Sequence, residues 1–187
     1  DQFPVPVFQT GSGTQTNMNV NEVIANKANE ILGGKLGEYK FVHPNDHVNM
    51  SQSTNDTFPT AILVGCVLSV EDNLLPALKQ LKKSLEKKSK EFDNIIKVGR
   101  THLQDATPIR LGQEFSGYAS MISHDIHRIN SAMEECTQLP IGGTAVGTGI
   151  NTLEGFDTLV CTFITEETDI EFKVCDNKFE LLSSQNP

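Results

Sequence analysis

Tryptophan is absent from the 187-residue sequence, and aromatic residues make up only 6% of it. Hydrophobic residues reach 37%, which is below the average of globular domains. This is little material for a core that the chain closes by itself, so we expect further chain or a partner to cover part of its apolar surface. The sequence also lacks an initiating Met, and we expect it to be an internal piece of a longer protein.

Positive charge is scarce as well, because 15 basic residues stand against 24 acidic ones and the formal net charge is -9. This balance argues against nucleic acid and anionic membrane surfaces as partners. It leaves room for a small anion, since local donors dominate within a Debye length of roughly 8 Å. The four cysteines show neither CxxC pairing nor metal-ligand spacing. We expect reduced structural thiols in an intracellular protein.

Long hydrophobic runs and a leader segment are also missing. No apolar run approaches the roughly 18 residues of a membrane-spanning helix. Residues 1–8 lack the charge and the apolar core of a signal peptide. We therefore expect no membrane partner and no secretion, and we expect the cytoplasm or the mitochondrial matrix as the compartment.

The amino-terminal third of the sequence predicts one helix and a long loop. The helix is expected near 19–32, with Asn19 and Glu22 at capping-box spacing and Gly33–Gly34 as its stop. Residues 35–55 show little periodicity, and we expect them to connect this helix to the next one without regular structure of their own.

Two long amphipathic stripes follow. The first, over about 59–92, has nearly heptad spacing and predicts a helix that Pro76 should kink or divide. The second predicts a helix near 109–136. A shorter amphipathic segment near 154–167 precedes a tail, 170–187, with an extended piece and a helical turn. Two helices of this length cannot bury their stripes in one small globule, so we expect a bundle assembled across subunits.

The first of three polar clusters is Thr10–Asn19, directly ahead of the first predicted helix. Its glycines let the backbone come close to a ligand, and Ser12 and Thr14 add hydroxyl groups. The free N–H groups and the dipole of the following helix favour an anion. The alternative is a polar loop with an ordinary helix cap.

The second cluster, Ser51–Thr57, repeats this arrangement ahead of the longest predicted helix. We expect Asp56 or Thr57 to cap that helix, with Pro59 in its first turn. The hydroxyl and amide groups that precede Asp56 exceed what capping requires, and they suit a carboxylate ligand.

The third cluster, Gly99–Pro108, contains a cation, an imidazole and a carboxylate, in Arg100, His102 and Asp105. It ends in a proline suited to the first turn of a helix, so we expect a helix entrance here. A single histidine is more often structural than catalytic. The case for His102 rests on its polar neighbours and on the two clusters of the same composition.

Two further motifs, a pair of histidines and a glycine-rich loop, have spacings that are reminiscent of known binding sites. His43 and His47 have a spacing that would suit a metal in a helix, but Pro44 opposes that geometry, so we expect a surface turn or a second small-anion contact. The glycine-rich loop Gly142–Gly149 lacks the Lys-Ser/Thr of a phosphate-binding loop and follows a helix. We expect it to serve tight packing or to offer backbone donors to a ligand.

Three donor-rich segments ahead of helices fit one substrate with more than one negative group, which indicates an enzyme for a small di- or tricarboxylate. The same segments resemble class II fumarases, within the fumarase/aspartase superfamily, over essentially the whole chain. The matching stretches, in family order, are TGSGTQTNMNVNEVIANKA, VHPNDHVNMSQSTNDTFPTA, KVGRTHLQDATPIRLGQEFSGY and GGTAVGTGINT.

The resemblance implies an all-α fold, a long-helix bundle of the fumarase/aspartase type that is completed by oligomerisation into a homotetramer. It implies that residues 1–55 end an amino-terminal domain and that residues 56–187 begin the central helical bundle. The implied reaction is the reversible hydration of fumarate to L-malate, with no metal and no organic cofactor.

By matched position, the resemblance implies a site built from several subunits. His102 is the implied catalytic histidine. The implied substrate contacts are Ser12, Gly13, Thr14, Ser53, Thr54, Asn55 and Thr101. A second, non-catalytic carboxylate site is implied at His43, Pro44, Asn45 and Asp46.

The sequence departs from the fumarase pattern at two places. Thr54 stands where fumarases usually carry a second serine, and aspartases often have threonine there. Aspartases, however, typically have glutamine at the position of His102. The family's mobile GSS-containing loop, with the serine assigned as catalytic base, is missing, so we expect the 187 residues to be inactive alone. An aspartase-like ammonia lyase and a non-catalytic structural oligomer remain the alternatives.

Overall fold

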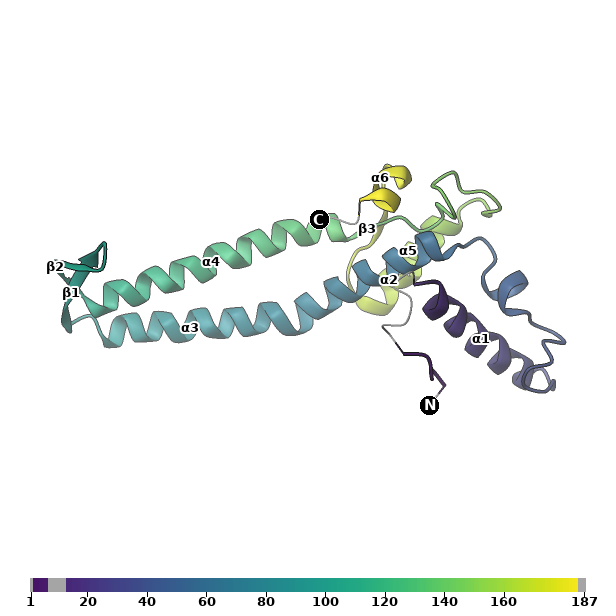
Figure 1. Cartoon of the computed structure of the whole chain (residues 1–187), viewed down its shortest axis with the longest axis horizontal. Coiled ribbons are helices and arrows are strands. Elements are labelled where there is room, and N and C mark those ends of the chain that lie inside the picture. Colours follow the sequence, from purple (N-terminus) through teal and green to yellow (C-terminus); the bar gives the residue numbers. More distant parts are fainter. Residues whose placement is uncertain (1, 7–12, 185–187) are drawn as a thin grey trace. The chain divides into compact units, whose positions relative to one another are not determined.

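The computed structural model describes residues 2–6 and 13–184 of the chain (Figure 1). It divides into two compact units, one formed by residues 1–65 and 136–187, the other by residues 66–135. Helices α1 to α6 are the main regular structure of both units, and the strands of the described residues form two two-stranded sheets. The predicted all-α class is therefore confirmed. We call the two parts unit 1 and unit 2.

Unit 1 begins with α1, Thr14–Ile31, which starts five residues before the predicted position. The proposed capping box is wrong, because Asn19 and Glu22 lie inside the helix and Gly13 stands at its N-cap. The predicted stop is confirmed. Gly33 has a φ of 80°, and the N–H groups of Gly33 and Gly34 donate back to the last turn, which is the Schellman arrangement.

The connection after α1 is not free of regular structure, since Pro44–Val48 form a π-helical turn, η1. Helix α2, Thr54–Ser69, follows. It starts five residues earlier than predicted, so Pro59 lies inside the helix and not in its first turn.

The second half of unit 1 matches its prediction. Helix α5 spans Phe156–Thr168 and lies against the short strand β4, Lys173–Val174. That strand pairs in parallel with β3, Gln138–Leu139. Helix α6, Lys178–Ser183, ends the described chain as the expected helical turn.

Unit 2 contains the π-helical turn η2, Val70–Leu74, and helix α3, Leu75–Glu91. The predicted joint is confirmed, because η2 ends at Leu74 and Pro76 lies in the first turn of α3. Proline has no N–H for the i→i−4 bond, and a π turn absorbs the break without ending the helix.

An 18-residue window of the continuous helix Thr54–Glu91 reaches a mean hydropathy of 1.6 with at most two charged residues. The prediction that no run approaches spanning length is therefore wrong on length and composition. The same composition is typical of a helix at the centre of a bundle, which is apolar on most sides.

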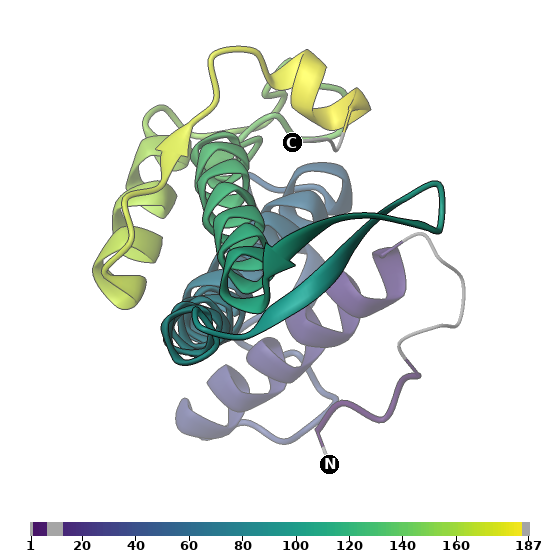
Figure 2. The ribbon, with the colours of Figure 1, turned by 90° about the vertical axis from the view of Figure 1, so that its left-hand side faces the viewer.

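The segment predicted as a helix entrance is instead an antiparallel hairpin, which lies nearest the viewer in Figure 2. Strand β1, Ile96–Thr101, pairs with β2, Gln104–Arg110, and only then does α4, Leu111–Cys136, begin. Pro108 pairs with Val98 inside the sheet. The expected position of Pro108 in a helix is wrong. Ile96 and Val98 in β1, like Thr107 and Ile109 in β2, are β-branched residues at alternate positions, which favour the extended chain.

Candidate functional site

Three segments of unit 1 meet around a set of asparagines. Asn17 of α1 donates from Nδ2 to the Asn49 side chain at 3.2 Å and to the Thr54 hydroxyl at 3.0 Å. Asn21, one turn later, donates to the same Asn49 oxygen at 2.9 Å. Asn17 and Asn21 are buried. These bonds attach the start of α1, and with it the first polar cluster, to the start of α2 and the second cluster.

Gly13 permits this close approach at the N-terminus of α1. Its φ of 74° is left-handed, and a Cβ at this position would lie 2.6 Å from the Phe58 ring. Only glycine fits both conditions without strain. Thr14, the next predicted contact, is the exposed first residue of the helix. Ser12 lies outside the described residues.

The second cluster forms a reciprocal cap at the start of α2. The Ser53 hydroxyl accepts from the Asn55 N–H at 3.3 Å, and the Ser53 N–H donates to Asp56 Oδ1 at 2.9 Å. The cap is therefore Ser53, and the expectation that Asp56 or Thr57 caps the helix is wrong. Asp56 is the capping-box partner in the first turn. Thr54 and Asn55 occupy the first turn between them, and Asn55 is exposed.

The Asp56 carboxylate also joins this turn to the glycine-rich loop. It is fully buried, and its Oδ2 accepts from the N–H groups of Gly142 and Thr144 at 3.0 and 2.8 Å. The Asn55 side chain adds a bond from Nδ2 to the Ala145 carbonyl at 2.8 Å. The loop does offer backbone donors, as predicted, but these two bind a carboxylate of the chain itself.

A cleft of about 380 Å³ lies between these two segments of unit 1. Its lining includes Asn45, Ser53, Thr144 and Ala145, together with Ser51 and Asn151. Ser51, Thr144 and Asn151 all have left-handed φ values, of 66°, 56° and 63°. Non-glycine residues in this region are strained, and such strain is concentrated at binding sites. The cleft is therefore the best-supported candidate site within unit 1.

The HPND motif forms the π turn η1 beside this cleft. The His43 Nδ1 accepts from the N–H groups of Asn45 and Asp46 at 3.3 and 3.2 Å, and His43 N–H donates to His47 Nδ1 at 2.8 Å. Both imidazoles thus use one ring nitrogen to hold the turn. Pro44 is buried in the turn, and Asn45 borders the same cleft as Ser53. In the described part of the chain no three His, Cys, Asp or Glu residues are grouped for a metal.

The third cluster belongs to unit 2, where Thr101 ends β1 and His102 lies at the hairpin tip. His102 and Leu103 have φ values of 48° and 61°, as both central residues of a type I′ turn require. Asparagine and glycine are the usual residues there, so this tip is strained. Both residues are exposed.

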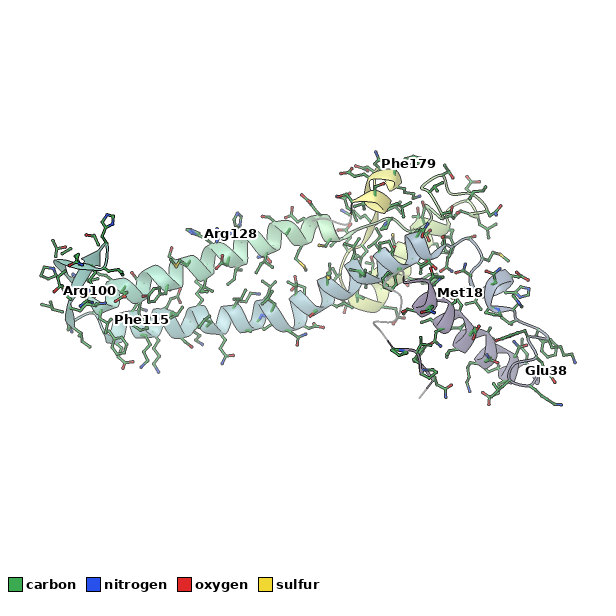
Figure 3. The ribbon with its side chains drawn as sticks, viewed as in Figure 1. Met18, Glu38, Arg100, Phe115, Arg128 and Phe179 are labelled. Carbon is green, nitrogen blue, oxygen red and sulfur yellow. The ribbon has the colours of Figure 1, made fainter. Side chains whose placement is uncertain are left out.

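Ion pairs stabilise the hairpin and its junction with α4. Arg100 Nε lies 3.2 Å from Asp105 Oδ1 across the strands, and Figure 3 places Arg100 at this end of unit 2. Lys97 Nζ lies 2.6 Å from Glu114 Oε2. The hydrogen bonds from Lys97 and from Tyr118 lower the pKa of the Glu114 carboxyl, and the bond to Glu114 raises the pKa of Tyr118.

Sequence reasoning missed several residues of this arrangement. The asparagine bonds between α1 and the second cluster had no signal, because a buried asparagine and a solvated one look alike in a sequence. The link from Asp56 to Gly142 and Thr144 spans 86 and 88 residues. The sole hint of it was the presence of a carboxylate among donors and of a glycine loop rich in N–H groups.

Comparison with known proteins identifies relatives of this chain. The sequence profile of a family described as lyase matches residues 1–186. The mitochondrial fumarate hydratase of Schizosaccharomyces pombe is 60% identical over 186 residues, which cover 100% of this chain and 36% of that protein. A class II fumarate hydratase of Helicobacter pylori is 54% identical over 185 residues, with coverages of 99% and 40%.

The structural comparison agrees. The crystal structure of a class II fumarase from Schistosoma mansoni matches with a TM-score of 0.91 and 44% identity, over 96% of this chain and 40% of that one. The predicted resemblance and helical fold are thereby confirmed, while the chain spans only about two fifths of the length of these relatives. Since the family profile covers nearly every residue, the chain belongs to the lyase family.

Proposed function

We propose that the full-length protein carrying this chain hydrates fumarate reversibly to L-malate. One observation carries the proposal: relatives named fumarate hydratase are 54–60% identical over 99–100% of this chain. We propose that the active protein is a homotetramer and that it is located in the cytoplasm or the mitochondrial matrix. Residues 1–55 end its amino-terminal domain, and residues 56–187 begin the central bundle.

The proposed chemistry needs donors that are fixed before the substrate arrives. Removing a proton next to a carboxylate produces a dianionic carboxylate, which preorganised hydroxyl and N–H donors stabilise. We assign substrate binding to Ser12, Gly13, Thr14, Ser53, Thr54, Asn55 and Thr101. The asparagine bonds of unit 1, and the cap formed by Ser53, support this assignment because they hold two of these segments together.

His102 is the proposed catalytic residue that positions water and moves its proton. Its exposed place on a strained hairpin tip supports this role, because a structural histidine would make contacts within its own unit. The base that works with it belongs to a part of the family sequence that these 187 residues do not include. His43, Pro44, Asn45 and Asp46 form the second, non-catalytic carboxylate site of the proposal.

The test is a fumarate assay of the full-length protein, by loss of ultraviolet absorbance, with and without ammonia. We expect hydration without ammonia, and a loss of at least about 100-fold in kcat for His102→Asn. His124→Asn is the matched control, because His124 is an exposed histidine on α4 of the same unit.

Three outcomes would contradict parts of the proposal. Activity that requires ammonia identifies an aspartase-like lyase, and inactivity toward all succinate-type substrates identifies a structural oligomer. Equal activity of His102→Asn and the wild type removes His102 from catalysis and leaves the reaction unchanged.

A further inference from the structure

Asp56 is a buried acid to which the reaction proposed above gives no role. Its side chain is completely inaccessible to solvent. Oδ1 accepts from the Ser53 N–H at 2.9 Å and from the Thr57 hydroxyl at 3.3 Å, and that hydroxyl lies equally close to Gln52 Oε1. Oδ2 accepts from the N–H groups of Gly142 and Thr144. Both oxygens are thus fully used, and no Lys, Arg or His in the described ranges forms an ion pair with this carboxylate.

Capping α2 does not explain a carboxylate in this place. The Ser53 hydroxyl already caps the helix, and an exposed side chain would serve as well in the capping box. Burying a carboxylate is costly unless hydrogen bonds replace its water. Here two of the four bonds reach a loop more than eighty residues away. The second oxygen therefore serves the loop and not the helix.

The loop that Asp56 holds has an unfavourable backbone. Gly142 and Thr144 have left-handed φ values of 83° and 56°, which turn their N–H groups toward the same carboxylate oxygen. A Cβ on Gly142 would meet the Asp157 side chain at 2.7 Å. Thr144 carries the strain of a β-branched residue in this region. Asp56 Oδ2 is the acceptor that both left-handed residues share, while the bond from Asn55 to the Ala145 carbonyl holds the loop from its other side.

Both ends of this link border the cleft of unit 1. Ser53 lines it from the turn before α2, and Thr144 and Ala145 line it from the loop. The Thr144 hydroxyl is the one buried side-chain donor among the described residues without a hydrogen-bond partner. A loop held by buried bonds, with strain and an unused hydroxyl beside a cleft, is arranged for binding and not for packing alone.

We propose that Asp56 is a positioning residue, whose carboxylate fixes the turn Ser53–Asn55 against the loop Gly142–Ala145 and so sets the width of the cleft. It acts on the ligand only through these two segments. In its effect on activity this inference rests on the proposed hydration of fumarate. The expected effect on the positions of the two segments does not depend on that reaction.

The decisive variant is Asp56→Asn in the full-length protein. The amide has the shape of the carboxylate but only one acceptor oxygen, so its NH2 group must face either Ser53 N–H or the N–H pair of the loop. We expect hydrogen exchange, measured by mass spectrometry, to become at least about 10-fold faster in peptides covering 51–57 and 141–146. Peptides of α5, in the same unit, should keep their wild-type rates.

The second readout is a comparison of kcat and KM for fumarate. Displaced donors weaken the transition state more than the bound substrate, so we expect kcat to fall about 10- to 100-fold and KM to stay within about 3-fold. The control is Asn29→Ala, which removes another fully buried polar side chain of unit 1 that binds the backbone of residues 41 and 42. It should lower thermal stability but keep kcat and the exchange rates of 141–146.

If Asp56→Asn does not fold, Thr57→Val removes the hydroxyl that lies 3.3 Å from Asp56 Oδ1 and 3.3 Å from Gln52 Oε1, and leaves the carboxylate in place. It should speed exchange in the same two peptides by about 3-fold. Faster exchange across the whole of unit 1 would overturn the positioning role, and so would wild-type rates in both peptides. If the wild type does not hydrate fumarate, the proposed function fails, while local exchange in 51–57 and 141–146 still decides the role of Asp56.

Discussion

Unit 1 and unit 2 differ in what they bury. All seven buried polar or charged residues of the described chain belong to unit 1, among them Asn17, Asn29, Asp56 and Thr144. In unit 2 the buried hydrophobic residues are Val67, Leu75 and Ala119, and its charged groups pair at the surface. Unit 1 therefore buries hydrogen-bonded polar side chains together with apolar ones, whereas unit 2 buries, among its described residues, few side chains and none that is polar or charged.

Because of this difference, the two units differ in how far their own residues fix their structure. Buried hydrogen bonds are directional, so the cleft of unit 1 is defined by residues of the chain itself. Long helices with exposed apolar residues gain stability mainly when other helices cover them. Leu81, Tyr118 and Met121 are 46%, 42% and 61% exposed. The family comparison fits this contrast, because the chain covers only 40% of the fumarase structure that it matches.

The largest effect is expected at the exposed apolar residues of unit 2. Met121→Asp places a charge on the exposed apolar side of α4. If another subunit covers that side, an unpaired buried charge costs about 3 kcal/mol or more per copy. We expect the full-length oligomer to dissociate, measured by light scattering after size exclusion. His127→Asp, an exposed polar site on another face of the same helix, should leave the mass unchanged. An intact oligomer with Met121→Asp would show that this surface faces solvent.

The next largest effect tests the polar interior of unit 1. The Asn29 side chain is fully buried, accepts from Phe41 N–H at 2.8 Å and donates to the Val42 carbonyl at 2.7 Å. Asn29→Ala leaves these backbone groups unpaired, and we expect a loss of about 3 kcal/mol in the free energy of unfolding by urea.

Asn26→Ala on the same helix is the matched control for Asn29→Ala. Its partners, the Gly37 N–H and the Glu22 carbonyl, are solvent-accessible, so water replaces the lost bonds. We expect a loss of about 1 kcal/mol or less. Equal losses for the two variants would mean that the interior of unit 1 is not specifically polar.

The same contrast decides what the sequence could reveal. The periodic stripes predicted α3, α4 and α5, and Pro76 predicted the joint, because these features depend on local spacing. The start of α1, the cap of α2 and the hairpin were predicted wrongly. At α1 a contact between distant residues, Asn17 with Thr54, accompanies the earlier start, whereas the α2 cap and the hairpin follow from local residues that were misread: Ser53 at the cap and the β-branched residues of the two strands. The family motifs named the candidate residues of the site, but not the buried bonds that hold them.

The thiols extend the comparison to reactivity. Desolvation, with the nearby Asp157 carboxylate, raises the pKa of the Cys161 thiol of unit 1 from 9.0 to about 11, whereas Cys66 of unit 2 is exposed. At pH 8 the thiolate fraction of Cys161 is about 100-fold lower than that of an ordinary thiol, so Cys66 should react first with a disulfide reagent.

The raised pKa of Cys161 also predicts a dependence of stability on pH. A folded pKa above the unfolded one gives stability that is complete below about pH 9 and is lost as the pH rises toward about 11. Cys161→Val should remove this part of the alkaline loss in urea unfolding. An unchanged slope between pH 9 and 11 would contradict the burial of a neutral thiol.

The smallest effect compares two glycines. Gly117 lies inside α4, and a Cβ there would meet nothing within 4 Å, whereas a Cβ on Gly13 of unit 1 would meet the Phe58 ring. Gly117→Ala should therefore stabilise by about 1 kcal/mol through the helix preference of alanine. Gly13→Ala should destabilise by about 2 kcal/mol or more, because the left-handed backbone and the ring both oppose it. Urea unfolding of the full-length protein measures both. A loss of stability with Gly117→Ala would mean that chain outside these 187 residues packs against α4 at this glycine, and that unit 2 acquires its close packing only in the assembled protein.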